Sequence, residues 1–167
     1  VLLFVGRVTV AAVPVHARLG CGPRTIADGE DPVDVLVHTP FPLPPGVVVR
    51  CRAVGVLRMD DESGGDAKVL AVPVDEICPL FEHWKSIADV PDIRLRQIQH
   101  FFEHYKDLEA GKWVNIIGWA GVDVAHAEIL DGIERSETEK RVQSQDAGGS
   151  PCWGPRQNRR VTLPTRL

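Results

Sequence analysis

A series of β-branched runs separated by proline- and glycine-rich turns constrains the fold of this chain more than any other feature. The runs are residues 33–37, 47–59 and 68–74. In the longest run, Arg50, Arg52 and Arg58 stand at even positions among apolar residues, as in a strand with one solvated face. The turns at residues 39–46 and 60–66 hold the prolines and glycines that end strands. Strands joined in this way predict a small β-barrel.

The second half of the chain changes to a helical period. Apolar residues recur with helical spacing over residues 93–108, and Gly111 stands just after that segment, where helices commonly end. Residues 112–119 return to a strand pattern, and residues 122–133 predict a second amphipathic helix. The sequence therefore predicts a mainly β fold of the α+β type, in which helices flank the barrel.

The two ends of the chain differ from this middle part. Residues 1–24 have no clear period beyond a strand predicted over residues 2–13. Residues 136–167 are polar and then rich in proline, glycine and arginine, a composition with little to bury. We therefore divide the chain into an atypical N-terminal segment (residues 1–24), a folded core (residues 25–135) and a flexible tail (residues 136–167).

Composition and charge exclude several classes of protein. With 44% hydrophobic and 25% charged residues, the 167-residue chain is neither collagen-like nor wholly disordered, and it is long enough to bury a core. The formal net charge of −4 gives no overall positive field to attract nucleic acid. Residues 1–15 are apolar, but Arg7 interrupts them and a membrane span needs about 20 apolar residues. The four cysteines form no closely spaced pair, so we expect a cytoplasmic protein. Because of its charge and its short apolar stretch, we expect it to bind neither nucleic acid nor membranes.

Two acidic clusters lie at the ends of predicted strands, where loops commonly carry function. Residues 28–34 read DGEDPVD, and residues 60–66 read DDESGGD, with Lys68 two positions further on. Converging carboxylates repel one another unless a hard cation lies between them, and Mg²⁺ prefers such oxygen ligands. Taken alone, each cluster is more typical of a solvated turn. Their pairing on adjoining strands, with Lys68 after the second, makes a Mg²⁺ site and solvated turns equally compatible with the sequence.

Three segments in a fixed order identify a family. The chain resembles the soluble family I inorganic pyrophosphatases of bacteria in DGEDPVDVLVHTPFPLPPG, VVRCRAVGVLRMDDESGGDAKVLAVP and QHFFEHYKDLEAGKW. The resemblance runs from about Thr25 to Ile133. It implies a five-stranded closed barrel of the oligonucleotide-binding type with flanking helices. It also implies Mg²⁺-dependent hydrolysis of pyrophosphate to two orthophosphates, by a homo-oligomer that in bacteria is commonly a hexamer.

The resemblance assigns roles to four acidic residues. In the family's D-x-D-P-x-D signature, the aspartate before proline polarises the attacking water, which here is Asp31, counted also among the metal ligands. The last aspartate of the signature bridges two metal ions and corresponds to Asp34. Asp61 and Asp66 match the family's metal-binding acids in the loop between strands.

Three further residues match positions that contact phosphate. Lys68 corresponds to a lysine that binds a phosphate oxygen, and Tyr105 and Lys106 to the pair that holds the leaving phosphate. These roles agree with the reaction, because in-line attack on phosphorus needs donors that neutralise charge on both phosphates. A multi-metal site would lower the pKa of bound water and clamp the attacking and leaving oxygens.

The chain also departs from the family pattern. The first aspartate of the signature falls on Gly29, so Asp28, one residue earlier, would be a metal ligand only if the loop shifts its register. Residues 1–24 do not show the metal-site glutamate and the phosphate-binding lysine and arginine that relatives carry there, which implies a missing or altered N-terminal part. The alternative function is therefore an impaired homologue that acts only as a binding or oligomer subunit.

Two unrelated functions are less compatible with the sequence. Residues 100–104 read HFFEH, which matches the H-x-x-E-H zinc-protease motif. On a helix, however, His100 and His104 fall on the face opposite the apolar residues, away from any cleft. A nucleic-acid-binding barrel needs exposed aromatic residues and a basic groove, whereas aromatic residues make up only 6% here and the loops are acidic.

Overall fold

The computed structural model describes residues 2–4, 17–22, 25–27, 31–44 and 46–146. Its elements, in chain order, are β1 (Leu2–Phe4), β2 (Ala17–Cys21), β3 (Asp34–His38), β4 (Val48–Asp61), β5 (Gly64–Pro73), the 3-10 turns η1 (Pro79–Phe81) and η2 (Ile87–Asp89), α1 (Asp92–His104), β6 (Val114–Ala120) and α2 (Val122–Asp146). Four strands and two helices lie where the hydrophobic periodicity predicts them, within a few residues at most ends. The predicted mainly β architecture with two helices is confirmed.

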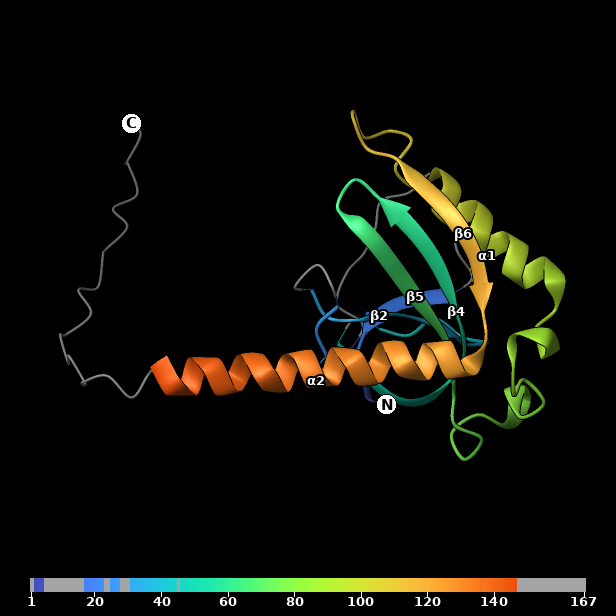
Figure 1. The fold of residues 1–167 in the computed structure, drawn as a ribbon. Helices are drawn as coiled ribbons and strands as arrows, with labels where there is room; N and C mark the ends of the chain where they lie inside the picture. Colours follow the sequence, from blue (N-terminus) through green and yellow to red (C-terminus); the bar gives the residue numbers. More distant parts are fainter. Residues whose placement is uncertain (1, 5–16, 23–24, 28–30, 45, 147–167) are drawn as a thin grey trace, which may run out of the picture.

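The strands form one sheet in the order β1-β2-β3-β5-β4-β6. β3 and β5 are parallel, with Asp34 opposite Lys68, and the other neighbours are antiparallel. β1 additionally pairs with β4, where Leu2 lies opposite Arg50. Figure 1 shows α1 beside β6 at one edge of the sheet, and α2 crossing the sheet and extending past it.

Alternation along the strands gives the sheet two buried faces. On one face, Leu57 and Met59 of β4 pack in a cluster with Phe102 of α1. On the other, Val56 of β4 packs in a cluster with Ile129 of α2. Each helix thus covers its own face of the sheet, and the hairpin of β4 and β5 supplies side chains to both. This hairpin is the rigid element from which the candidate site is built.

Two irregularities in the β4 ladders shape the sheet. The β4–β5 register shifts between Ala53 and Gly55, where a Cβ on Gly55 would lie 2.1 Å from the Ile87 side chain. The β4–β6 register shifts after Arg58, which leaves Ile117 as the extra residue of a bulge. Gly118, next to it, has φ 136°, a conformation that favours glycine. Bulges increase local twist and redirect side chains.

The structure differs from the sequence predictions mainly at element ends. α2 continues to Asp146, well beyond the predicted end at residue 133. Residues 134–146 lack glycine and proline and are rich in good helix formers, although their apolar pattern is weak. Ser136 is buried, so the helix still packs there. No helix in the described part of the chain is long and apolar enough to cross a membrane.

Other predictions fall partly outside the described residues. Of the strand predicted over residues 2–13, only β1 is described, and residues 147–167 of the predicted tail are not. β2, in contrast, was not predicted. Its sequence, ARLGC, has no β-branched residue. β2 is instead stabilised by an unbroken ladder with β3, from Ala17 opposite His38 to Cys21 opposite Asp34.

Candidate active site

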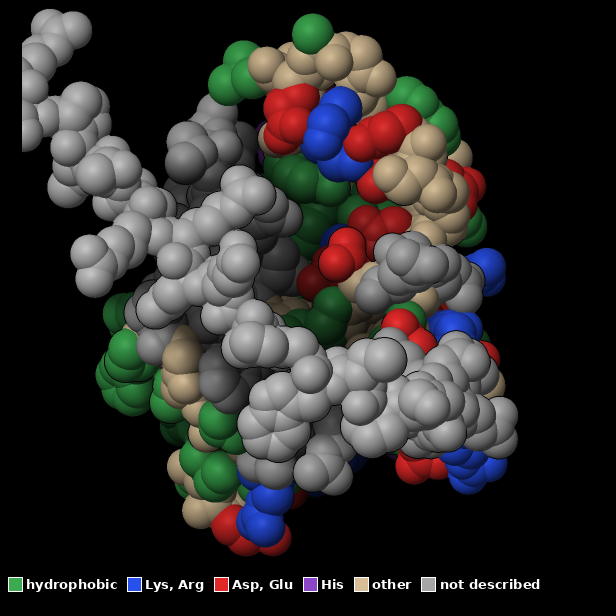
Figure 2. All heavy atoms as spheres, turned by 90° about the vertical axis from the view of Figure 1, so that its left-hand side faces the viewer, with side chains coloured by type: hydrophobic (Ala, Val, Ile, Leu, Met, Phe, Trp, Pro, Cys, Tyr) green, Lys and Arg blue, Asp and Glu red, His purple; other side chains and the backbone are tan. Residues whose placement is uncertain are grey.

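An acidic cleft of about 370 Å³ opens where β3 begins and the β4–β5 hairpin turns. Six carboxylates line it: Asp31, Asp34, Asp60, Asp61, Asp66 and Glu128. Figure 2 shows acidic side chains gathered around this hollow. Among the described lining residues the only bases are Lys68 and Arg58, so the cleft carries an excess of negative charge. A site of this kind attracts cations.

Strand register explains why residues distant in sequence meet in this cleft. Asp66 and Lys68 are two positions apart on β5, so their side chains lie on the same face. The parallel pairing of β3 with β5 sets Asp34 opposite Lys68. Asp61 ends β4, close to the start of β5. The ladder therefore brings Asp34 close to Lys68 and Asp66.

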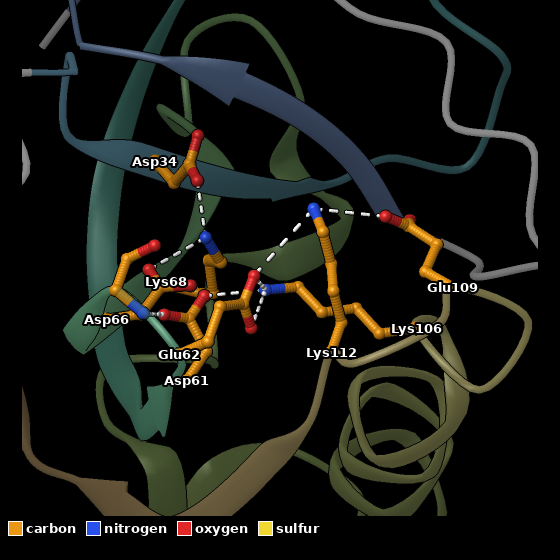
Figure 3. A network of polar contacts seen from close by, with 9 residues as sticks. Asp34, Asp61, Glu62, Asp66, Lys68, Lys106, Glu109 and Lys112 are labelled. Carbon is orange, nitrogen blue, oxygen red and sulfur yellow. Dashed lines mark hydrogen bonds and ion pairs between the residues drawn. The ribbon is translucent and has the colours of Figure 1, made fainter.

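Lys68 lies between two carboxylates at the base of the cleft (Figure 3). Its Nζ donates to Asp34 Oδ2 and lies 2.8 Å from Asp66 Oδ1. The Lys68 side chain is only 7% exposed. Burial alone would lower the pKa of Lys68, but the charges of Asp34 and Asp66 outweigh burial and raise it, so the ammonium stays protonated. Burial also raises the pKa of Asp66, although Lys68 opposes that rise.

Lys106 forms a second lysine–carboxylate group at the same hairpin. Its Nζ donates to Asp61 Oδ2 at 2.7 Å and to Glu62 Oε1 at 3.0 Å. Burial raises the pKa of Asp61, but the hydrogen bonds from Lys106 and from the Ser63 amide outweigh it and hold that pKa below its usual value. Burial lowers the pKa of Lys106, yet the hydrogen bonds to both carboxylates raise it overall. Both groups therefore stay charged at neutral pH.

The polar network continues from Glu62 toward β6. Lys112 Nζ lies 3.7 Å from Glu62 Oε1 and 3.0 Å from Glu109 Oε2 (Figure 3). Lys106 and Lys112 thus tie the segment between α1 and β6 to the β4–β5 turn.

Tyr105 lies at the end of α1 and packs on two phenylalanines. Its ring centroid is 5.8 Å from that of Phe101 and 5.4 Å from that of Phe102. Lys106 Nζ lies 5.7 Å from the centroid of the Tyr105 ring. Burial raises the pKa of Tyr105, so its hydroxyl keeps its proton and can donate a hydrogen bond.

The structure brings together most of the predicted site residues. Five of them line the cleft: Asp31, Asp34, Asp61, Asp66 and Lys68. Lys106 reaches this group through its contact with Asp61, and Tyr105 stands beside Lys106. The predicted metal ligand Asp28, together with Gly29, lies outside the described residues.

Several cleft residues were missed by sequence reasoning. Asp60 lines the cleft, and Glu62 lies beside it on Lys106; both belong to the acidic cluster at residues 60–66, so the cluster itself signals them. Arg58 was predicted only as a solvated strand residue. Glu128 lies on α2, and its sequence context gives no hint that α2 passes the cleft.

The donors around the cleft suit a hard divalent cation. Carboxylate oxygens dominate its described lining, and neither histidine nor cysteine occurs there. No three His, Cys, Asp or Glu side chains of the described ranges form a ready-made metal cluster. The Lys68 ammonium lies between Asp34 and Asp66. Mg²⁺ tolerates such a site, because it keeps several waters and needs only one or two carboxylates.

The zinc-protease motif lies on a solvated surface. His100 and His104 are exposed, and their ring centroids lie 4.3 Å apart. His104 Nδ1 is 2.8 Å from the carbonyl oxygen of His100. Neither residue lines the acidic cleft. The helical geometry predicted from the sequence is confirmed, and this arrangement gives no support to a protease.

Comparison with known proteins points to one family. The family profile described as "Pyrophosphatase: Inorganic pyrophosphatase" matches residues 2–137. The chain is 52% identical over 135 residues to the inorganic pyrophosphatase of Haemophilus ducreyi, covering 81% of this chain and 77% of that relative. It is 51% identical over 131 residues to that of Pseudomonas aeruginosa, covering 78% of this chain and 75% of the relative.

Solved structures agree with these sequence matches. The inorganic pyrophosphatase of Thermus thermophilus superposes with a TM-score of 0.77 at 38% identity, covering 82% of this chain and 91% of that one. That of Coxiella burnetii gives a TM-score of 0.74 at 43% identity, covering 77% of each chain. Identity of this degree over most of the chain, together with the shared fold, leads to one conclusion: the chain belongs to the inorganic pyrophosphatase family.

Proposed function

We propose that this chain hydrolyses inorganic pyrophosphate to two orthophosphates in a Mg²⁺-dependent reaction. The observation that carries the proposal is the group formed by Lys68, Asp34 and Asp66 at the base of the acidic cleft. The protonated Lys68 can donate to phosphate oxygens, and the two carboxylates offer the oxygen ligands that a hard cation prefers. Close similarity to enzymes named inorganic pyrophosphatase supports the same reaction.

The proposed metal ligands are Asp34 and Asp66, with Asp61 and Asp31 beside them. Asp28 is the further candidate that depends on the register of its loop. Bound divalent cations would supply a water of lowered pKa and neutralise charge on the phosphates. Lys68 pairs with Asp34 and Asp66, so it would compete with a cation for these carboxylates. Where a cation takes its place, Lys68 would be available to donate to a phosphate oxygen.

The remaining roles follow from the protonation states of this chain's own side chains. Asp31 is exposed at the mouth of the cleft, where it would polarise the attacking water. Lys68 and Lys106 remain protonated and would stabilise negative charge on the phosphate oxygens. Tyr105, which keeps its proton, would donate a hydrogen bond to the leaving phosphate.

Two finer features belong to the same proposal. We infer a closed barrel of the oligonucleotide-binding type, which is supported by the pairing of β1 with both β2 and β4. A closed barrel would hold the strand ends that carry the site rigidly. By family resemblance we also expect a homo-oligomer, a hexamer, acting in the cytoplasm.

The decisive experiment is phosphate release from pyrophosphate by the purified chain, with Mg²⁺ and after chelation by EDTA. We expect release that needs Mg²⁺ and falls at least about 100-fold without it, because the reaction depends on metal-activated water. Circular dichroism of the same sample checks the fold. A well-folded protein with no Mg²⁺-dependent release would instead support the impaired homologue that acts only in binding or assembly.

A further inference from the structure

We propose that Arg58 is a substrate-binding residue, whose guanidinium binds phosphate oxygens of pyrophosphate from the α2 side of the cleft. This inference rests on the proposed function. Arg58 lies on β4, apart from the Lys68 and Lys106 groups, and it lines the same cleft as Asp31.

The packing of β4 explains why Arg58 reaches the cleft. Val56 is buried in the cluster that includes Ile129 of α2. Two residues further along the same face, Arg58 is exposed. The cover provided by α2 therefore ends between these positions, and the Arg58 side chain emerges where the cleft begins.

A break in the neighbouring strand coincides with this position. Arg58 lies opposite Gly118 of β6, and the next β4 residue lies opposite Ile116, so Ile117 is extra. Ile117 is 52% exposed and lines the cleft together with Arg58. The bulge depends on Gly118, whose φ of 136° disfavours other residues. Bulges occur frequently next to active sites, where they redirect side chains.

The charge distribution distinguishes Arg58 from the other bases of the site. Lys68 and Lys106 each contact two carboxylates. Within the described ranges, Arg58 forms no hydrogen bond or ion pair, although the cleft is rich in carboxylates. On the same strand, Arg50 pairs with Glu76 and Arg52 with Asp75. Of the bases in the described lining of the cleft, Arg58 is thus the one that can bind an incoming anion without breaking a contact with another side chain.

The chemistry of arginine suits this role. A guanidinium presents several N–H donors in a planar fork that matches two oxygens of one phosphate. Pyrophosphate carries several negative charges, which the surplus carboxylates of the cleft would otherwise repel. An arginine on the α2 side would therefore help to hold the substrate while the lysines hold the opposite side.

The test compares Arg58→Gln with Arg50→Gln, which removes another exposed arginine from the far end of the same strand. With saturating Mg²⁺, we expect Arg58→Gln to raise KM for pyrophosphate about tenfold, as for one charge-assisted contact, while kcat changes less than about threefold. Arg58→Lys should fall in between, because it keeps the charge but loses the fork. Arg50→Gln should behave like the original chain.

Binding of methylenediphosphonate, a pyrophosphate analogue that is not hydrolysed, gives an independent readout and separates the two proposals. Weaker binding by Arg58→Gln, or by Arg58→Lys if the glutamine variant does not fold, supports the inference. Equal KM and equal analogue binding in the Arg58 and Arg50 variants would overturn it while leaving the proposed function intact. An original chain that neither hydrolyses pyrophosphate nor binds the analogue would overturn both.

Discussion

Two charged clusters stand at opposite ends of the β4–β5 hairpin, and they differ in which kind of group is in excess. The cleft cluster contains Asp34, Asp61, Asp66, Lys68 and Lys106. The anchor cluster contains Arg52, Asp75 and Lys85. In the cleft cluster three carboxylates stand against two ammonium groups, and further carboxylates line the cleft around them. In the anchor cluster N–H donors exceed the carboxylate oxygens.

The excess donors of the anchor cluster are satisfied within the protein. Arg52 Nη1 donates to the carbonyl of Trp84, and Arg52 Nη2 donates to the carbonyl of Phe81 at 2.5 Å. Asp75 accepts from Arg52 and, at 3.0 Å, from Lys85. The surplus carboxylates of the cleft instead line an open hollow. An excess that is satisfied within the protein thus indicates a structural cluster, whereas an excess that faces a cleft indicates a binding site.

The largest expected effect comes from removing one carboxylate of the cleft cluster. Asp66→Asn keeps the shape of the side chain but removes a proposed metal ligand, so we expect kcat to fall at least about 100-fold. Stability should change by less than about 1 kcal/mol, because Lys68 keeps its contact with Asp34. Phosphate release and urea unfolding measure the two quantities.

The same substitution in the anchor cluster is the matched control. Asp75→Asn should leave kcat within about twofold, because Asp75 is far along the hairpin from the cleft. If Asp75→Asn reduced turnover as strongly as Asp66→Asn, the distinction between the two clusters would be wrong.

The sequence predicted the cleft cluster better than the anchor cluster for a physical reason. Asp66 and Lys68 are neighbours on one strand, so the strand period places them on one face. Asp34 joins them only through the parallel register of β3 and β5. The strand pattern alone does not determine this register, and only the family resemblance assigned Asp34 to the same site. Arg52 binds backbone carbonyls, which every residue type carries, so the sequence gives no sign of these contacts.

The same distinction applies to the elements of the fold. β4 and β5 were predicted because their own residues favour strands, whereas β2 depends on its ladder with β3. α2 exceeds its predicted length because helix formers without a strong apolar period still continue a helix already packed on the sheet. The local sequence pattern thus predicts the helices and strands that their own residues stabilise. Contacts between distant segments determine the remaining elements and their ends.

Arg52→Met should have the second-largest effect, on stability rather than on turnover. The substitution keeps apolar bulk but removes the donors to the carbonyls of Phe81 and Trp84, both of which belong to buried residues. We expect a loss of about 2 kcal/mol in the free energy of unfolding at neutral pH. Urea unfolding measures the loss, and kcat per folded molecule should stay within about twofold. A stable variant would show that these contacts contribute little.

The smallest effect should come from Lys85→Met and should depend on pH. The hydrogen bond from Lys85 is the main reason why the pKa of Asp75 lies below its usual value, with Arg52 acting in the same direction. A carboxyl pKa lowered by folding contributes stability that is present above the unfolded value and is lost as pH falls through the folded value. Both side chains are substantially exposed, so at pH 7 the variant should lose no more than about 2 °C in Tm. As the pH falls below the ordinary range of a carboxyl pKa and Asp75 becomes protonated, the difference should shrink. A Tm loss that does not shrink as the solution is acidified would mean that Lys85 acts through packing and not through the charge of Asp75.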